Sequence, residues 1–275
     1  MRAVLAIAGL DSSGGAGLAR DVATIAGMGL HAKVAATAVT VQSADAVRRV
    51  VPLAPDLVTD QVVAAFEDLA PSAVKVGMLG APQVALAVAR ALADAQARNV
   101  VVDPVLVSTS GTPLLAGAAA PGSTAVIPDA GEKDAASALA ALFRQATLVT
   151  PNVPEAEALL GRKIADRGCM AAAAADLLGR YGCAVLLKGG HLGLAEDCLA
   201  SAGGTTWVGV PAVAGGSARG TGCMLSSAIA CGLAAGGDLL GAVRQAKLLL
   251  ARGLAGRVAV PGGAYLQMPR RWRMA

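Results

Sequence analysis

The chain contains few aromatic residues and few histidines, and three familiar nucleotide- or metal-binding motifs are missing from its 275 residues. Because aromatics make up only 2% of a composition that is 55% hydrophobic, its helices are expected to pack closely through small side chains. The histidines, His31 and His191, lie far apart, so no His-x-x-x-His pair could bind a metal from one helix. The absence of any Gly-Lys dipeptide excludes a Walker A loop. No Gly-x-Gly-x-x-Gly follows the first apolar run, which disfavours a Rossmann dinucleotide site.

The five cysteines do not have the spacing of a disulfide framework or a structural zinc site, because their number is odd and no Cys-x-x-Cys occurs. The net charge of +4 is modest and no basic stripe is interleaved with aromatics, which disfavours nucleic-acid binding. The apolar start of the chain is short and runs into a Gly/Ser turn, as a buried strand does. The uncharged stretch between Arg219 and Asp238 suits a core helix better than a membrane span. We therefore expect a cytoplasmic protein that binds neither nucleic acid nor membrane.

Short β-branched runs alternate with helical segments along the whole chain. Strands are predicted at residues 3–8, 33–41, 49–53, 74–76, 100–103, 148–150 and 184–188, with a hairpin of 198–202 and 206–210. Helices are predicted at residues 16–28, 56–69, 82–97, 133–145, 155–160, 166–181, 223–235 and 239–254. This alternation predicts an α/β fold with a mainly parallel central sheet and helices on both faces. We expect one domain over residues 1–275, with a frayed tail from about 265.

Polar residues recur where the predicted strands end. In open α/β sheets ligands bind at the carboxyl ends of the strands, so these residues are expected to share one rim of the sheet. They comprise Asp11, Gln42, Met78, Asp103, residues 108–111, Asn152, Glu155, Lys188 and His191. The sequence therefore predicts an active site at this rim.

Residues 220–223 read Gly-Thr-Gly-Cys and open a long uncharged helical segment. Such a run predicts a helix N-terminus whose free backbone N–H groups and dipole suit a phosphate or a transferring phosphoryl group. In the first turn the pKa of the Cys223 thiol is expected to be lowered from about 8.5, which makes it a candidate base. The alternative is that Gly222 permits close packing and Cys223 is a small buried hydrophobe.

Asp103, Asn152 and Glu155 could hold Mg²⁺, mostly through water, because this ion dehydrates reluctantly. Asn152 and Glu155 could equally form the cap and the first-turn acid of the following helix. Lys188, between Leu187 and two glycines, could neutralise a phosphate or be an ordinary lysine at a strand end.

Six segments, taken in order, resemble the bacterial hydroxymethylpyrimidine/phosphomethylpyrimidine kinases. These segments are residues 1–17, 73–80, 101–106, 149–157, 187–191 and 220–223. The resemblance covers nearly the whole chain, and six motifs in the family's order are specific. It implies a ribokinase-like fold and the MgATP-dependent phosphorylation of 4-amino-5-hydroxymethyl-2-methylpyrimidine, and then of its monophosphate, in thiamine biosynthesis. It also implies a homodimer or a larger homo-oligomer.

The resemblance also implies roles for individual residues. Cys223 matches the family's base, and the backbone of Gly220, Thr221 and Gly222 would stabilise charge on the transferring phosphoryl group. The residues that match the substrate pocket are Gln42, which would bind the aminopyrimidine edge, and Asp21, Gly9 and Met78. The residues that match the nucleotide and magnesium region are Asn152, Lys188, Asp103 and Glu155.

Two other functions stay open from the sequence. One is a pyridoxal or pyridoxine kinase of the same fold, because that hydroxymethyl-bearing ring is similar in size. The other is a non-catalytic relative that binds a pyrimidine. The chain departs from the family pattern at Ser43-Ala44 after Gln42, and at Arg20 and Arg219. The glycines at 215 and 216 make that segment a candidate lid.

Overall fold

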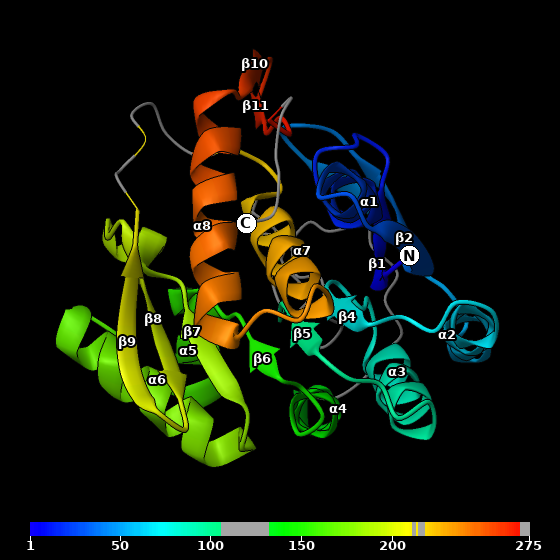
Figure 1. Ribbon diagram of the computed structural model, residues 1–275, viewed down its shortest axis with the longest axis horizontal. Helices are drawn as coiled ribbons and strands as arrows, with labels where there is room; N and C mark the ends of the chain where they lie inside the picture. Colours follow the sequence, from blue (N-terminus) through cyan, green and yellow to red (C-terminus); the bar gives the residue numbers. More distant parts are fainter. Residues whose placement is uncertain (106–131, 211–212, 214–217, 270–275) are drawn as a thin grey trace.

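The computed structural model describes residues 1–105, 132–210, 213 and 218–269, and it is built around a nine-stranded sheet (Figure 1). The strands are β1 (Ala3–Asp11), β2 (His31–Gln42), β3 (Val47–Pro52), β4 (Ala73–Val76), β5 (Val100–Val102), β6 (Leu148–Val149), β7 (Ala184–Leu187), β8 (Glu196–Ser201) and β9 (Gly204–Gly209). Their order across the sheet is β3-β2-β1-β4-β5-β6-β7-β8-β9. Neighbours from β2 to β7 run parallel, whereas β3, β8 and β9 pair antiparallel. The predicted parallel sheet and the predicted hairpin are confirmed.

Helices cover both faces of this sheet. They are α1 (Gly17–Gly27), α2 (Pro55–Glu67), α3 (Pro82–Asp94), α4 (Glu132–Phe143), α5 (Val153–Leu160), α6 (Arg167–Tyr181), α7 (Thr221–Ala234) and α8 (Leu239–Ala255). Helices α2 to α6 pack on one face, and α1, α7 and α8 pack on the other, with α7 and α8 side by side (Figure 1). The prediction of helices on both faces is confirmed.

Alternating side chains of the central strands enter two separate cores. In β4, Val74 and Val76 are buried in the core beneath α2 to α6, and Ala73 is buried in the core beneath α1, α7 and α8. Lys75 lies on the same face of β4 as Ala73, because side chains two residues apart in a strand share a face. A fully buried ammonium among apolar residues requires a partner, since an isolated charge is too costly to remove from water.

Local sequence signals explain where several helices begin and end. Pro55 and Pro82 occupy the first turns of α2 and α3, where the missing N–H costs nothing. The side chains of Asp166 and Asp238 cap α6 and α8 by accepting backbone N–H bonds. Gly182 ends α6 with a φ of +74°, a conformation that glycine adopts without strain.

A short hairpin near the end of the chain was not predicted. It consists of β10 (Val258–Val260) and β11 (Gly263–Tyr265), joined at Gly262 with a φ of +84°. The backbone N–H of Arg219 donates to the carbonyl of Ala264, so the hairpin fixes the segment that precedes α7. Leu266 is buried, so the expectation of fraying from residue 265 is wrong at this position.

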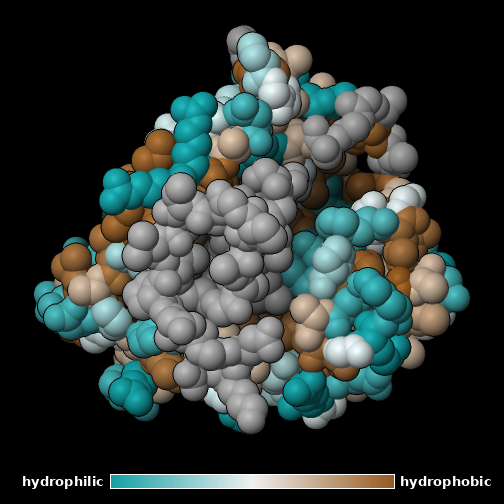
Figure 2. Space-filling model, turned by 180° about the vertical axis from the view of Figure 1, so that it is seen from behind, coloured by the Kyte–Doolittle hydropathy of each residue, from teal (hydrophilic) through white to brown (hydrophobic). Residues whose placement is uncertain are grey.

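Hydrophobic residues reach the described surface in several places, interspersed with hydrophilic ones (Figure 2). Among the residues that the structure describes, no helix combines the length and the apolar character needed to span a bilayer. The apolar helix α7 is instead buried between the sheet and α8.

The close packing of α7 on α8 gives a first prediction. A Cβ at Gly232 in α7 would lie 2.8 Å from the Cβ of Ala242 in α8. We expect Gly232→Ala to lower the free energy of unfolding by about 1–3 kcal/mol, because the two backbones must move apart.

Urea unfolding measures this change, and Gly179→Ala in α6 is the matched control. A Cβ at Gly179 would meet no atom within 4 Å, so this variant should gain about 0.4–1 kcal/mol from its better helix propensity. Equal effects of the two variants would show that small residues do not set the spacing of α7 and α8.

Candidate active site

The N-terminus of α7 lies against the loop that follows β1. Gly220 is the N-cap of α7 with a φ of +80°, and a Cβ there would lie 2.2 Å from the carbonyl oxygen of Gly15. Only glycine fits this position, for its conformation as well as for the available space. The first backbone N–H groups of a helix have no partner within the helix, so α7 begins with donors that suit an anion. The helix N-terminus predicted at residues 220–223 is confirmed.

Two charged residues predicted from separate strand ends meet beside this helix start. The Nζ of Lys188 lies 2.8 Å from Oδ1 of Asp103, which also accepts a hydrogen bond from Thr150 at 3.1 Å. A Cβ at Gly222 would lie 2.9 Å from Oδ2 of Asp103 and 3.6 Å from Nζ of Lys188. The structure thus brings Gly222, Asp103 and Lys188 together, with Thr150 as a residue that was not predicted.

Lys188 keeps its positive charge in this setting. Burial disfavours the ammonium, but Asp103 and Glu155 outweigh it and raise the pKa of Lys188 above its ordinary value. Asp103 is itself almost completely buried. A partly buried ammonium next to free helix N–H groups forms a positive surface that could bind phosphate oxygens.

Asn152 and Glu155 form a capping box at the start of α5. The Asn152 side chain accepts from the N–H of Glu155, and the Glu155 carboxylate accepts from the N–H of Asn152, both at 2.8 Å. The interpretation of these residues as a helix cap is confirmed. A parallel bridge between Asn152 and Lys188 also places the cap at the end of β7.

Asp103 and Glu155 could hold Mg²⁺ together. Both carboxylates raise the pKa of Lys188, so both lie near the same ammonium. Within the described part of the chain, no cluster of three or more His, Cys, Asp or Glu side chains could hold a metal ion. Two carboxylates already engaged in hydrogen bonds fit an ion that keeps most of its water.

The environment of Cys223 reverses one expectation. The residue is half-buried in the first turn of α7, but the pKa of its thiol is raised to about 11 rather than lowered. Burial is the main cause and the carboxylates of Asp21 and Asp103 add to it, while Lys75 and the backbone N–H of Gly17 act in the opposite direction. The helix start alone does not make Cys223 a thiolate.

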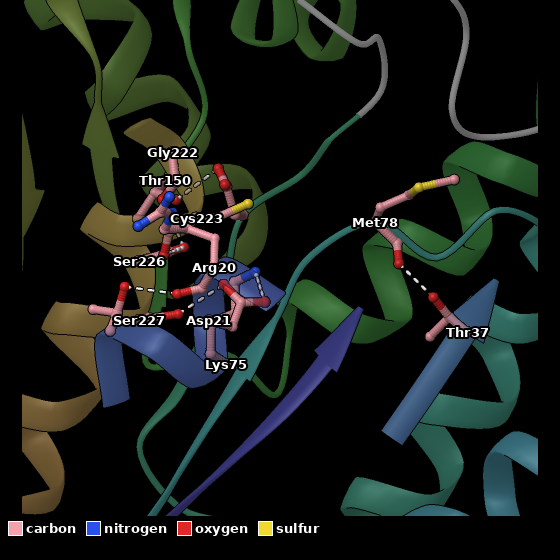
Figure 3. Close-up of polar contacts among 12 residues, drawn as sticks. Arg20, Asp21, Thr37, Lys75, Met78, Thr150, Gly222, Cys223, Ser226 and Ser227 are labelled. Atoms are coloured by element: carbon pink, nitrogen blue, oxygen red, sulfur yellow. Dashed lines mark hydrogen bonds and ion pairs between the residues drawn. The ribbon is translucent and has the colours of Figure 1, made fainter. Parts of the chain in front are cut away.

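Asp21 was expected to line the substrate pocket. It instead lies beneath the site and is fully buried, so it lines no open pocket. Its carboxylate accepts from Nζ of Lys75 at 2.7 Å and from the hydroxyl of Ser227 at 2.8 Å (Figure 3). Lys75 and Ser227 were not predicted as site residues. The only sequence signal was a lone charge between Val74 and Val76 in an apolar strand.

The other residues expected at the substrate pocket lie near the ends of β1, β2 and β4. Gly9 contacts Met78, because a Cβ at Gly9 would lie 2.9 Å from the Met78 sulfur. The Met78 carbonyl accepts from the Thr37 hydroxyl at 2.7 Å, apart from the cluster around Cys223 (Figure 3). Gln42 is half-buried at the end of β2, and its backbone exchanges two hydrogen bonds with the Ser12 hydroxyl.

A cavity of about 560 Å³ lies elsewhere, between β3 and the starts of α2 and α3. It is lined by Arg49, Pro52, Pro55 and Gln83 among others, and by none of the predicted site residues. This cavity and the cluster of charged groups at the strand ends therefore lie in different places, and the cluster is the candidate site. The predicted residues 108–111 and the candidate lid at 215–216 lie outside the described residues.

Known proteins resemble this chain over nearly its whole length. Residues 11–266 match the family model described as phosphomethylpyrimidine kinase. The chain belongs to this family. The hydroxymethylpyrimidine/phosphomethylpyrimidine kinase of Rhizobium meliloti is 39% identical over 249 residues, covering 90% of this chain and 88% of that protein. The thiamine biosynthesis bifunctional protein ThiED of Geobacter sulfurreducens is 37% identical over 263 residues, 94% of this chain, which spans half of that protein.

Solved structures show the same fold. Phosphomethylpyrimidine kinase from Clostridium difficile has a TM-score of 0.76 at 34% identity, covering 92% of this chain and 99% of that one. Pyridoxal kinase from Staphylococcus aureus, in complex with AMP-PCP and pyridoxal, has a TM-score of 0.82 at 26% identity, covering 97% and 93%. The ribokinase-like fold and the assignment as a kinase are confirmed.

The raised pKa of Cys223 gives a second prediction. Only the thiolate reacts with iodoacetamide, and a thiol with a pKa of about 11 is deprotonated to about one part in a thousand at pH 8. The alkylation rate of Cys223, followed by peptide mass spectrometry, should therefore rise about tenfold per pH unit between pH 7 and 10. The fully buried Cys231 should stay unmodified in the same samples. A rate that levels off below pH 9 would contradict the raised pKa.

Proposed function

We propose that this protein transfers the γ-phosphoryl group of ATP to 4-amino-5-hydroxymethyl-2-methylpyrimidine and then phosphorylates the monophosphate, in thiamine biosynthesis. The observation that carries this proposal is the juxtaposition of the α7 N-terminus, Asp103 and Lys188 in a chain of the phosphomethylpyrimidine kinase family. Phosphoryl transfer requires mainly positioning and charge stabilisation, which such an arrangement supplies. The whole chain acts as one kinase domain in this proposal.

In this proposal Cys223 is the general base. Its thiolate form takes the proton of the substrate hydroxyl as the hydroxyl oxygen attacks the γ-phosphorus and the bond to the leaving ADP oxygen breaks. The thiol is mostly protonated at neutral pH, so turnover should increase as the pH rises. The half-buried position of Cys223 in the first turn of α7 supports this role.

The groups proposed to bind the phosphates are Lys188, Asn152 and the backbone of Gly220, Thr221 and Gly222. The negative charge on the transferring phosphoryl group is spread over its oxygens. The N–H groups at the start of α7 would donate to these oxygens, and Lys188 would balance their charge.

Asp103 and Glu155 are proposed to hold Mg²⁺ through water. When bound with ATP, this ion neutralises charge on the β- and γ-phosphates. The hydrogen bond from Thr150 and the capping box keep the two carboxylates in place for this role.

The pyrimidine is proposed to lie between the ends of β1 and β2, where Gln42 would bind the aminopyrimidine edge, and Gly9 and Met78 would contact the ring. The identity to proteins named hydroxymethylpyrimidine/phosphomethylpyrimidine kinase reaches 39%, against 26% for the pyridoxal kinase. This difference favours the pyrimidine over pyridoxal as the substrate.

A product assay tests this function. Purified protein with MgATP is given the hydroxymethylpyrimidine or pyridoxal, and mass spectrometry separates mono- from diphosphate products. We expect both pyrimidine phosphates, and Cys223→Ala should lower kcat by about 10²–10⁴-fold, the usual contribution of a general base. A clear preference for pyridoxal, or pyrimidine binding without turnover, would refute the assignment.

Gln42→Leu separates binding from chemistry in the same assay. The variant removes the amide but keeps a similar volume, so KM for the pyrimidine should rise with little change in kcat. An unchanged KM would place the amino group of the ring elsewhere. The KM for ATP is the internal control. Gln42 ends β2 and Lys188 follows β7, and these two strands are not neighbours in the sheet.

We also propose that the protein is a cytoplasmic homodimer. All five cysteines are free, as is usual in a reducing compartment. Leu10, Val39 and Val51 lie in register on β1, β2 and β3 and are each more than 40% exposed. Such an apolar row on an uncovered part of a sheet supports a contact with a second copy.

Sedimentation velocity tests the dimer. Val39→Glu should shift the protein toward a monomer, because it introduces a charge into the apolar row. Val63→Glu on α2, a similarly exposed valine outside the row, should leave the oligomeric state unchanged. A monomeric wild type would refute the dimer.

A further inference from the structure

A buried ion pair on the α7 side of the sheet has no part in the function proposed above. Lys75 is fully buried in β4, and its ammonium lies 2.7 Å from Asp21, which is also fully buried. A Cβ at Gly77, two residues further along, would lie 2.5 Å from Nζ of Lys75. The lysine side chain therefore extends along the strand toward the carboxyl end of the sheet, where the phosphate-binding groups lie.

Asp21 connects this lysine to the catalytic helix. One carboxylate oxygen accepts from Lys75, and the other accepts from the hydroxyl of Ser227 in α7 at 2.8 Å (Figure 3). Cys223 and Ser227 are four residues apart in a helix and so share one face. The face of α7 that carries the thiol is therefore hydrogen-bonded to the ion pair.

The charges around Cys223 come from several elements. Asp21 and the buried Arg20 lie on α1, Lys75 on β4, and Asp103 after β5. Although burial acts in the opposite direction, Asp21, Cys223 and Asp103 raise the pKa of Lys75, so its ammonium persists at every physiological pH. Arg20 donates to the carbonyl of Leu266 and is held on the C-terminal segment.

We propose that Lys75 is a positioning residue that keeps a permanent positive charge beneath Cys223, and that Asp21 and Ser227 attach this charge to α7. The Lys75 ammonium stabilises the Cys223 thiolate when the sulfur loses its proton. The Asp21 carboxylate weakens this stabilisation, because its negative charge partly cancels that of the ammonium. The consequence for turnover rests on the proposed role of Cys223 as the base. The consequence for the thiol itself does not.

Opposite effects of the two partners test this proposal. In Lys75→Met the Cys223 thiolate loses its counter-charge, so the pKa of the thiol should rise by about one unit. Alkylation of Cys223 by iodoacetamide at pH 8 should then slow by about tenfold. In Asp21→Asn the lysine keeps Asp103 as a nearby counter-charge but loses the carboxylate that compensates it most, so alkylation should accelerate by about tenfold. Cys169, half-buried on the distant helix α6, is the internal control for reagent and time.

Two further variants separate charge from packing. Lys75→Met/Asp21→Asn removes both charges together. The rate at which its Cys223 is alkylated should stay within about threefold of the wild-type rate. Ser227→Ala removes a hydrogen bond and no charge, so it should also stay within about threefold. If Lys75→Met does not fold, Asp21→Asn and the double variant still differ by the lysine alone, and the double variant must react more slowly.

Either of two results would overturn the proposal. Lys75→Met and Asp21→Asn could change the alkylation rate in the same direction or not at all, as expected for a purely structural ion pair. Ser227→Ala could also match the effect of Lys75→Met, which would make packing the cause. The pH dependence of kcat is measured in parallel. Alkylation that responds while kcat does not would refute Cys223 as the base and leave the role of Lys75 intact.

Discussion

The contact between the start of helix α7 and the edge of the sheet is so close that no side chain fits into it, and the rest of the site depends on this contact. At Gly220 a Cβ would collide with the carbonyl of Gly15, and at Gly222 it would collide with the carboxylate of Asp103. Backbone N–H groups can reach a phosphate only where side chains do not hold it away. Glycine at both positions therefore places helix donors and the Lys188 ammonium around one point.

Two ion pairs lie at this point, the partly buried pair of Lys188 with Asp103 and the fully buried pair of Lys75 with Asp21. Removing such charges from water is costly, and the pair must have good geometry and further hydrogen bonds to recover the cost. Thr150 and Ser227 supply those hydrogen bonds. The raised pKa of Cys223 follows from the same arrangement, because burial and two carboxylates outweigh the helix start and one lysine. A resting thiol that is protonated is less open to oxidation than a free thiolate.

The composition explains how a helix as apolar as α7 can lie flat between the sheet and α8. With 2% aromatics and 34 glycines, the chain brings backbones close together instead of filling the space with large rings. Gly232 against Ala242 is one such contact. Close packing also limits the movement of α7, and a site built on a fixed helix keeps its geometry.

Hydrophobic periodicity and local caps such as Asn152 with Glu155 act within a few residues, so the succession of strands and helices along the chain follows from the sequence alone. The sequence also placed Asp103 and Lys188 at one rim, since parallel strands end on the same side. The hairpin of β10 and β11 was not predicted, and neither of its strands is buried.

The contacts between charged residues, and their effect on the pKa of Cys223, depend on the folded chain. Lys75 is 54 residues from Asp21, and Ser227 is 206 residues from it. No local pattern encodes such pairs. Burial and the nearest charges set the pKa of a thiol, and both are properties of the folded chain that a run of neighbouring residues does not contain.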